Sequence, residues 1–202
     1  MPNPGSPEYS PAIVVMGAGD ATGGAIAKRF AREGYAACVV RRDASRLSAL
    51  VEQIESAGGK ARPFGVDARD EEQVVALFDT IEREVGPVEV AVFNIGANVS
   101  FPITETTSRV FRKVWEMACY GGFLTGREAA KRMLSRGRGT IIFTGAIDTP
   151  WIAQNFPERH ALKDRDGILN PDDIAEAYWQ LHRQPRSAWT LELDLRPWME
   201  PF

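Results

Sequence analysis

The chain has 202 residues, a formal net charge of −3, 44% hydrophobic residues and 25% charged residues. These values predict one globular domain with its own core, and they give no electrostatic reason to expect nucleic acid or an anionic membrane as a partner. No apolar run approaches the roughly 18 residues that a membrane span needs.

The first ten residues contain neither a basic nor an apolar block, so residues 1–10 are expected to be a disordered leader and not a signal peptide. From residue 11 onward, short apolar runs alternate with longer stretches of helical period. This alternation is typical of βαβ units and predicts a single doubly wound α/β domain with a parallel sheet over residues 11–202. The expected strands are residues 12–16, 36–40, 61–65, 88–94, 140–144 and 189–195.

Helical periodicity fills the intervals between these strands. Apolar residues spaced i, i+3, i+4, i+7 predict one buried helix face over residues 47–54 and another over residues 74–81. Asp70 and Gln73 resemble a capping box that starts the second of these helices. The remaining helices are expected at 108–135, with an interruption at Gly121-Gly122, and at about 172–183 after Asn170-Pro171.

A glycine-rich turn, GAGDATGG, directly follows the first expected strand and opens the first helix. Gly17, Gly19 and Gly23 have no Cβ, so the backbone can approach a pyrophosphate there, and the helix N-terminus offers free N–H groups to it. A merely tight βα turn is the alternative interpretation. A mononucleotide P-loop is disfavoured because no Gly-Lys-Ser/Thr closes the stretch. The position of the turn within a βαβ unit therefore favours a dinucleotide site.

Arg41 and Arg42 stand at the end of the second expected strand. An NAD-binding fold usually has an acidic residue there, which holds the ribose 2′-hydroxyl. Two guanidinium groups suit a 2′-phosphate instead, so we expect NADP(H) to be preferred over NAD(H). The alternative is that both arginines are ordinary surface charges of a βα loop.

Neither the cysteines nor the histidines have the spacing of a metal site. Cys38 and Cys119 lie far apart in apolar surroundings, and His160 and His182 have no His or Cys nearby. Two reduced core thiols in a cytoplasmic protein are therefore expected, rather than a disulfide, a catalytic cysteine or a zinc ion.

These residues make the chain resemble the short-chain dehydrogenase/reductase (SDR) family along nearly its whole length. The family's opening motif, Thr-Gly-x-x-x-Gly-x-Gly, falls on Met16, Gly17, Ala21 and Gly23, so that two of its four named positions differ. The resemblance implies a Rossmann-type fold, in which helices cover both faces of a parallel sheet in three layers.

Three later motifs of the family also have counterparts. Asp67 matches the Asp that contacts adenine, and Phe93-Asn94-Ile95-Gly96 matches the Asn-Asn-Ala-Gly of the fourth strand in looser form. Thr149 resembles the Thr that contacts the nicotinamide carboxamide. The residues expected to hold the cofactor are thus Gly17, Gly19, Ala21, Gly23, Arg41, Arg42, Asp67, Asn94, Gly96 and Thr149.

The catalytic residues that the resemblance implies are missing from the sequence. In the family, a Tyr-x-x-x-Lys pair handles the proton of the alcohol or carbonyl, a Ser orients the substrate and an Asn completes a proton relay. None of the four tyrosines has a lysine four residues later, and Ala146 and Ala118 stand at the Ser and Asn positions. We therefore assign no catalytic residue.

The stretch TIIFTGAIDTPW, residues 140–151, joins the fifth expected strand to a loop that resembles the family's element after its sixth strand. A crossover between two parallel strands takes about a dozen residues or more, and no such segment stands between the fifth strand and this loop. We infer that the helix bearing Tyr and Lys and the sixth strand are missing, with a junction at about 144–149, which leaves the fold incomplete relative to the family. Such a form either exposes the fifth strand as an apolar edge or draws residues 189–195 into the gap, and it should be less stable and more prone to associate.

Three functional hypotheses follow from the sequence. The first is an NADP(H)-dependent oxidoreductase that moves a hydride between the cofactor and a small-molecule alcohol or carbonyl, with impaired catalysis. The second is a non-catalytic NADP(H)-binding sensor or partner subunit, and the third is a poorly folded fragment. The resemblance leaves a homo-oligomer open, but the missing helix commonly builds the dimer interface of the family.

Overall fold

The computed structural model describes most of the domain. The described residues are 10–96, 101–143, 154, 157–163, 167–185, 187–188, 190 and 195. The sequence-based expectations for the leader, for the junction, for Thr149 and Ala146 and for most of strand 189–195 lie outside them.

Five parallel strands form one sheet in the order β3-β2-β1-β4-β5. The chain runs outward from β1 to β3 and then returns to add β4 on the other side of β1, which is the strand order of a doubly wound α/β fold. The expected strands in the described part are confirmed to within one residue at either end. Their bounds are β1 Ala12–Met16, β2 Ala36–Arg41, β3 Lys60–Gly65, β4 Val88–Phe93 and β5 Thr140–Phe143.

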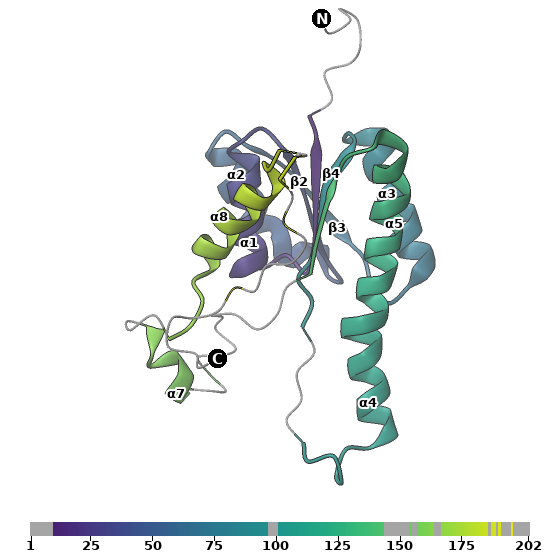
Figure 1. Ribbon diagram of the computed structural model, residues 1–202, viewed down its shortest axis with the longest axis vertical. Helices are drawn as coiled ribbons and strands as arrows, with labels where there is room; N and C mark the ends of the chain where they lie inside the picture. Colours follow the sequence, from purple (N-terminus) through teal and green to yellow (C-terminus); the bar gives the residue numbers. More distant parts are fainter. Residues whose placement is uncertain are drawn as a thin grey trace, which may run out of the picture.

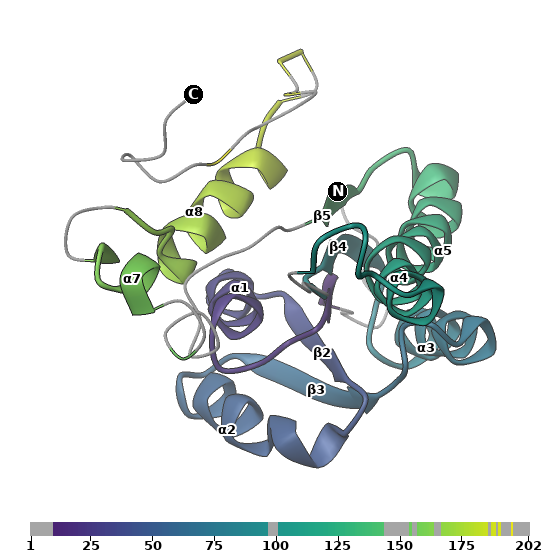
Figure 2. The same ribbon diagram turned by 90° about the horizontal axis from the view of Figure 1, so that it is seen from below.

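Helices cover both faces of this sheet and make three layers (Figures 1 and 2). One face carries α1, α2 and α8, and α1 and α8 pack closely against each other. The other face carries α3 and α5. The bounds are α1 Thr22–Ala31, a 3₁₀ turn Ala44–Leu47, α2 Ser48–Ser56, α3 Glu71–Glu84, α4 Ser108–Trp115, a π turn Glu116–Tyr120, α5 Gly121–Arg136, α7 Pro157–His160 and α8 Pro171–His182.

Alternate residues of each strand feed two separate cores. Ile13 and Val15 of β1 face α1 and α8, while Val14 and Met16 face α3 and α5. All four are fully buried. The near-continuous apolar run of this strand therefore reflects a sheet that is covered on both faces. No helix in the described part is long and apolar enough to cross a membrane.

The expected interruption at Gly121-Gly122 is wrong. The helical region runs without a break from α4 through the π turn into α5, and the two glycines begin α5. A Cβ at Gly121 would lie 3.4 Å from ring carbons of Phe93, and one at Gly122 would lie 3.4 Å from Phe143. The glycines thus let the helix approach β4 and β5 closely.

The capping pattern at the start of α3 is confirmed in a modified form. The Asp70 side chain accepts a hydrogen bond from the Gln73 N–H, as the N-cap of a capping box does. The Gln73 side chain donates to the Asp70 carboxylate and accepts from the Asp67 N–H. It therefore ties the helix start to the turn after β3.

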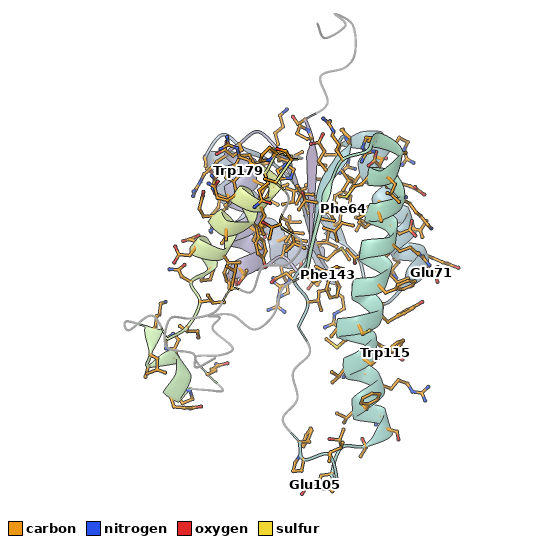
Figure 3. All side chains as sticks on the ribbon, viewed as in Figure 1. Phe64, Glu71, Glu105, Trp115, Phe143 and Trp179 are labelled. Carbon is orange, nitrogen blue, oxygen red and sulfur yellow. The ribbon has the colours of Figure 1, made fainter. Side chains whose placement is uncertain are left out.

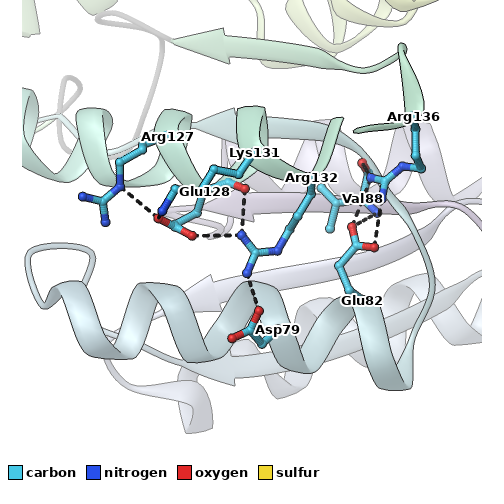
Figure 4. Close-up of polar contacts among 8 residues, drawn as sticks. All are labelled: Asp79, Glu82, Val88, Arg127, Glu128, Lys131, Arg132 and Arg136. Atoms are coloured by element: carbon cyan, nitrogen blue, oxygen red, sulfur yellow. Dashed lines mark hydrogen bonds and ion pairs between the residues drawn. The ribbon is translucent and has the colours of Figure 1, made fainter. Parts of the chain in front are cut away.

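Ion pairs fix α5 against α3 (Figure 4). Glu128 is only 2% exposed and receives hydrogen bonds from Arg127, Lys131 and Arg132, all within 2.9 Å. Arg132 also reaches Asp79 of α3. Nearby, Arg136 of α5 pairs with Glu82 of α3 and donates to the Val88 carbonyl. Removing the cations around a buried carboxylate is costly, because the carboxylate would then remain buried without a compensating charge.

Candidate functional site

The turn between β1 and α1 lies at the C-terminal edge of the sheet, between β2 and β4. Gly17 and Ala18 both donate backbone hydrogen bonds to the Val40 carbonyl, at 2.9 and 3.1 Å. On the other side, the Asn94 N–H donates to the Met16 carbonyl at 2.8 Å. The strand order changes direction between β1 and β4, and ligands of open α/β sheets bind in the crevice at that point.

Gly17, Gly23 and Asn94 form a closely fitted cradle at this point. Gly17 has a φ of +87°, and a Cβ there would lie 2.6 Å from the Asn94 carbonyl oxygen. A Cβ at Gly23 would lie 2.7 Å from the Gly17 oxygen. The Asn94 side-chain amide donates to that same oxygen at 3.1 Å, so it holds the turn in place. The structure brings these three expected residues together.

The N-terminus of α1 leaves its first N–H groups without a side-chain cap. Ala21 occupies the N-cap position and makes no capping hydrogen bond, and no acidic residue lies in the first turn. Thr22 is buried, and its hydroxyl has no hydrogen-bond partner among the described residues. A helix start of this kind suits an anion, because the free N–H groups and the helix dipole both favour negative charge.

Gly24 belongs to this turn although sequence reasoning missed it. A Cβ at Gly24 would lie 2.2 Å from the Gly19 carbonyl oxygen, so only glycine lets α1 begin so close to the turn. The signal was the Gly-Gly pair inside a helical stretch, since a glycine in a helix interior usually has a packing reason.

Arg41 and Arg42 differ in their relation to the turn. The Arg41 guanidinium lies beside Gly19, with Nη1 3.6 Å from the point where a Cβ of Gly19 would be. Arg41 is half-buried at the end of β2, whereas Arg42 is exposed and its charge contributes to the lowered pKa of Asp67. Of the two expected arginines, the structure therefore places Arg41 at the glycine turn.

Asp67 follows β3 on the same edge of the sheet. Its carboxylate accepts two hydrogen bonds from the Arg69 guanidinium, at 2.6 and 3.0 Å, and one from the Arg69 N–H. The Arg69 hydrogen bond holds the pKa of Asp67 below its usual value. The carboxylate is partly exposed and retains free lone pairs, so the expected contact with adenine is not blocked.

Gly96 is exposed, and a Cβ there would meet nothing within 4 Å. The structure thus gives no steric reason for a glycine at this expected position. Ala118, which stands where the family has its relay Asn, is exposed on the π turn.

The described tyrosines are engaged elsewhere. The Tyr35 hydroxyl lies 2.5 Å from Nε2 of His182, and the Tyr120 hydroxyl donates to Glu71. Burial raises the pKa of Tyr35 and of Tyr178 to about 12. A phenol with so high a pKa is a poor acid or base at neutral pH. No described tyrosine therefore replaces the missing catalytic pair.

Comparison with known proteins identifies a family for the chain, and the matched curated proteins are longer than the matched segment. The sequence profile of the family described as short chain dehydrogenase matches residues 11–154. The short chain dehydrogenase claC of Passalora fulva is 38% identical over 136 residues, which are 66% of this chain and 49% of that protein. The matched part of the chain spans about half the length of curated relatives such as claC.

Solved structures match over a larger share. The crystal structure of a short-chain dehydrogenase from Rhodopseudomonas palustris is 41% identical, with a TM-score of 0.78, and the match covers 93% of this chain and 98% of that one. A metagenomic short-chain oxidoreductase in complex with NADP has the same TM-score at 22% identity and covers 94% of this chain and 98% of its own. The latter likeness shows the fold alone.

Proposed function

The chain belongs to the short-chain dehydrogenase family, and from this premise we propose that it is an NADP(H)-binding oxidoreductase with impaired catalysis. The cradle of Gly17, Gly23 and Asn94 at the uncapped start of α1 carries the proposal. A backbone with no room for a Cβ at Gly17 and Gly23, beside free N–H groups at a helix start, fits a pyrophosphate. Both cysteines are free thiols, as in a protein of the reducing cytoplasm. Cys38 is buried as expected, but Cys119 is exposed on the π turn, so the expectation of a core thiol is wrong at that position.

The preference for NADP(H) over NAD(H) is supported by Arg41. Its guanidinium lies at the turn, on the strand end where the ribose 2′ position is read, and Arg41 itself takes the position of the usual acidic residue. The nearest carboxylate in the sequence, Asp43, is bonded to Ser45 instead. A guanidinium donates in a planar fork that matches a phosphate. Arg42, exposed beside it, would add charge without a fixed geometry.

The bound cofactor would supply a hydride to a small carbonyl compound, or accept one from an alcohol. The chain's own part would be to hold the pyrophosphate with Gly17 to Gly23, the 2′-phosphate with Arg41 and adenine beside Asp67. Without a Tyr-x-x-x-Lys pair, no described side chain supplies the proton, so turnover should be slow. General acid–base groups typically contribute about 10²–10⁴-fold to a rate.

Calorimetric titration with NADPH and with NADH tests the proposal. NADPH should bind more tightly than NADH. Arg41→Ala should reduce the ratio of NADPH affinity to NADH affinity about tenfold or more, because a charged hydrogen bond to the 2′-phosphate is lost. Arg42→Ala should reduce this ratio less. Equal binding of both cofactors to the unaltered chain would refute the preference, and no binding of either would refute the site.

A non-catalytic NADP(H)-binding protein, acting as a sensor or as a partner subunit, is the second candidate. The absence of Tyr-x-x-x-Lys from all 202 residues favours it. Incubation of the purified chain with NADPH and a panel of carbonyl compounds separates the two candidates. Cofactor oxidation above the substrate-free rate supports the enzyme, and tight NADPH binding without oxidation supports the binding protein.

A further inference from the structure

Helix α4 extends past the C-terminal edge of the sheet and has no buried residue (Figures 1 and 3). Its apolar side chains are strongly exposed: Phe111 is 66% exposed and Trp115 47%, and Ile103 in the preceding loop is 92% exposed. An isolated exposed apolar residue needs no explanation, but three neighbouring large ones on a projecting element mark an interaction site.

The three side chains share a surface cavity. Ile103, Phe111 and Trp115 line a cavity of about 530 Å³ together with Thr106, Ser108, Arg112 and Glu116. Its volume lies within the range of small-ligand sites, and its apolar walls are accompanied by a few polar groups. The cavity is open to solvent, because its described lining comes from α4, the loop before it and Glu116 directly after it.

The other side of α4 is basic. Arg109, Arg112 and Lys113 line a second cavity of about 540 Å³ with Arg69, Ser108 and Glu116. Arg69 is paired with Asp67, but none of the other three cations makes an ion pair with a described residue. Three cations without an ion-pair partner among the described residues thus share this cavity with one carboxylate, Glu116, in a chain whose net charge is −3.

The two cavities meet along one ridge of the helix. Ser108, Arg112 and Glu116 lie one turn apart and line both cavities, so Arg112 stands between the aromatic side and the basic side. A ligand that covers the ridge would meet apolar surface on one side and positive charge on the other.

We propose that α4 and the loop before it bind an amphiphilic anion, a small molecule with an apolar chain or ring and a phosphate or carboxylate head. Ile103, Phe111 and Trp115 take the apolar part. Arg112 and Lys113 take the head, because guanidinium and ammonium groups form their strongest hydrogen bonds with such anions. Arg109, Arg112 and Lys113 outnumber the single carboxylate of Glu116 in the basic cavity, so their charge disfavours a cationic head.

This site lies outside the nucleotide cradle, and its binding does not depend on hydride transfer. Among the described residues that line the two cavities, Arg69 is the one that also contacts an expected cofactor residue, because it holds Asp67. The test below uses the chain without a nucleotide, so failure to bind NADPH and failure to bind the anion are separate results.

Calorimetric titration with octyl phosphate, below the concentration at which it forms micelles, tests the proposal. Octyl phosphate should bind more tightly than ethyl phosphate and than octyltrimethylammonium. Arg112→Gln should weaken its binding about tenfold, the usual effect of losing a charged hydrogen bond. Arg83→Gln, which removes an exposed guanidinium from α3, is the matched control and should leave the affinity unchanged.

A second variant tests the apolar side. Phe111→Ser should weaken the binding of octyl phosphate but leave the binding of ethyl phosphate unchanged. Circular dichroism checks that the helices are retained. The proposal is overturned by equal affinity for octyltrimethylammonium, by equal loss in Arg83→Gln, or by octyl phosphate binding that neither α4 variant changes. It is also overturned if the chain binds anionic phosphatidylglycerol vesicles but not monomeric octyl phosphate, since the surface would then be a membrane contact.

Discussion

Gly17 and Gly34 have almost the same left-handed backbone, with φ angles of +87° and +88°. A Cβ at Gly34 would meet nothing within 4 Å, whereas one at Gly17 would lie 2.6 Å from the Asn94 carbonyl. Gly34 is therefore glycine for its backbone angle alone. Gly17 is glycine for its backbone angle and also for the close approach of β4 to the turn.

This pair gives a matched test of the cradle. Gly34→Ala should cost about 1 kcal/mol of unfolding free energy, the usual penalty of a left-handed alanine. Gly17→Ala should cost more and should also weaken NADPH binding at least tenfold, because the turn must move away from Asn94. Urea unfolding and NADPH titration measure the two effects. Equal effects of both substitutions would contradict the close-fit interpretation.

Single residues were predictable where their chemistry is unusual for their position. Gly17, Gly23 and Arg41 were predicted from the sequence because glycines in a βα turn and a cation at a strand end both suggest a phosphate. The structure places them at one turn, and their contact with a cofactor stays a prediction. The tie between Asn94 and the Gly17 carbonyl was not predictable, because it joins residues 77 positions apart. Gly24 was missed because the need for glycine there comes from the close approach of the Gly19 carbonyl, which the Gly-Gly pair alone does not specify.

At the scale of elements, the strands were predictable and the π turn was not. β1, β2 and β4 are buried on both faces and read as short apolar runs, so they could be located closely. The edge strands β3 and β5 are only partly buried, and their place in the alternation of strands and helices located them. The π turn Glu116–Tyr120 contains one extra residue per turn and leaves no regular periodicity to recognise. Gly121 and Gly122 indicated a break because glycine disfavours helix interiors, but contact with Phe93 and Phe143 outweighs that preference here.

The α3–α5 contact gives a pH-dependent prediction. Burial alone would raise the pKa of Glu128, but hydrogen bonds from Lys131, Arg132 and Arg127 lower it from 4.5 to about 2. The folded state therefore gains stability from the ionised carboxylate above about pH 4.5, and loses it as the pH falls toward 2. At neutral pH the shift corresponds to roughly 3 kcal/mol.

Glu128→Gln should lower the free energy of unfolding at pH 7 by about that amount, on the order of 3 kcal/mol. Near pH 3 the unfolding free energies of the variant and the unaltered chain should differ much less. Acid protonates the Glu128 carboxylate in the unfolded state, so its ionisation then stabilises the folded state by less. Glu52→Gln on α2 is the control, since Glu52 is exposed and has no ion pair with a described residue. Urea unfolding at the two pH values measures both variants. A difference that does not shrink with acid would contradict the assigned charge state.

At the scale of the whole molecule, the two edges of the sheet differ. The β3 edge contains Lys60, Arg62 and Pro63, which discourage pairing with another chain. The β5 edge has the sequence TIIF without charge or proline, and no described strand pairs with its outer side. The sequence could predict such an edge from the missing crossover. It could not determine which face of the molecule would carry the exposed apolar side chains, because that depends on how α5 packs.

The outer face of α5 supports the expectation that the chain associates with itself. Phe123 and Leu134 are exposed, Leu134 to 79%, and they lie about three turns apart on the side of α5 that faces away from the sheet. Two copies packed along this face would cover both side chains, and an interface related by a two-fold axis would do so for each copy at once. The unaltered chain should therefore show a molar mass that rises with concentration in light scattering.

Leu134→Lys should weaken this self-association about tenfold, because it replaces a buried apolar contact with a charge that meets its own copy across the two-fold axis. Ser135→Lys adds the same charge at the next exposed position, outside the line through Phe123 and Leu134, and should have little effect. Sedimentation velocity over a range of concentrations compares the three proteins. A strict monomer at every concentration would refute the interface, and an equal effect of both lysines would assign the association to general charge and not to this face of α5.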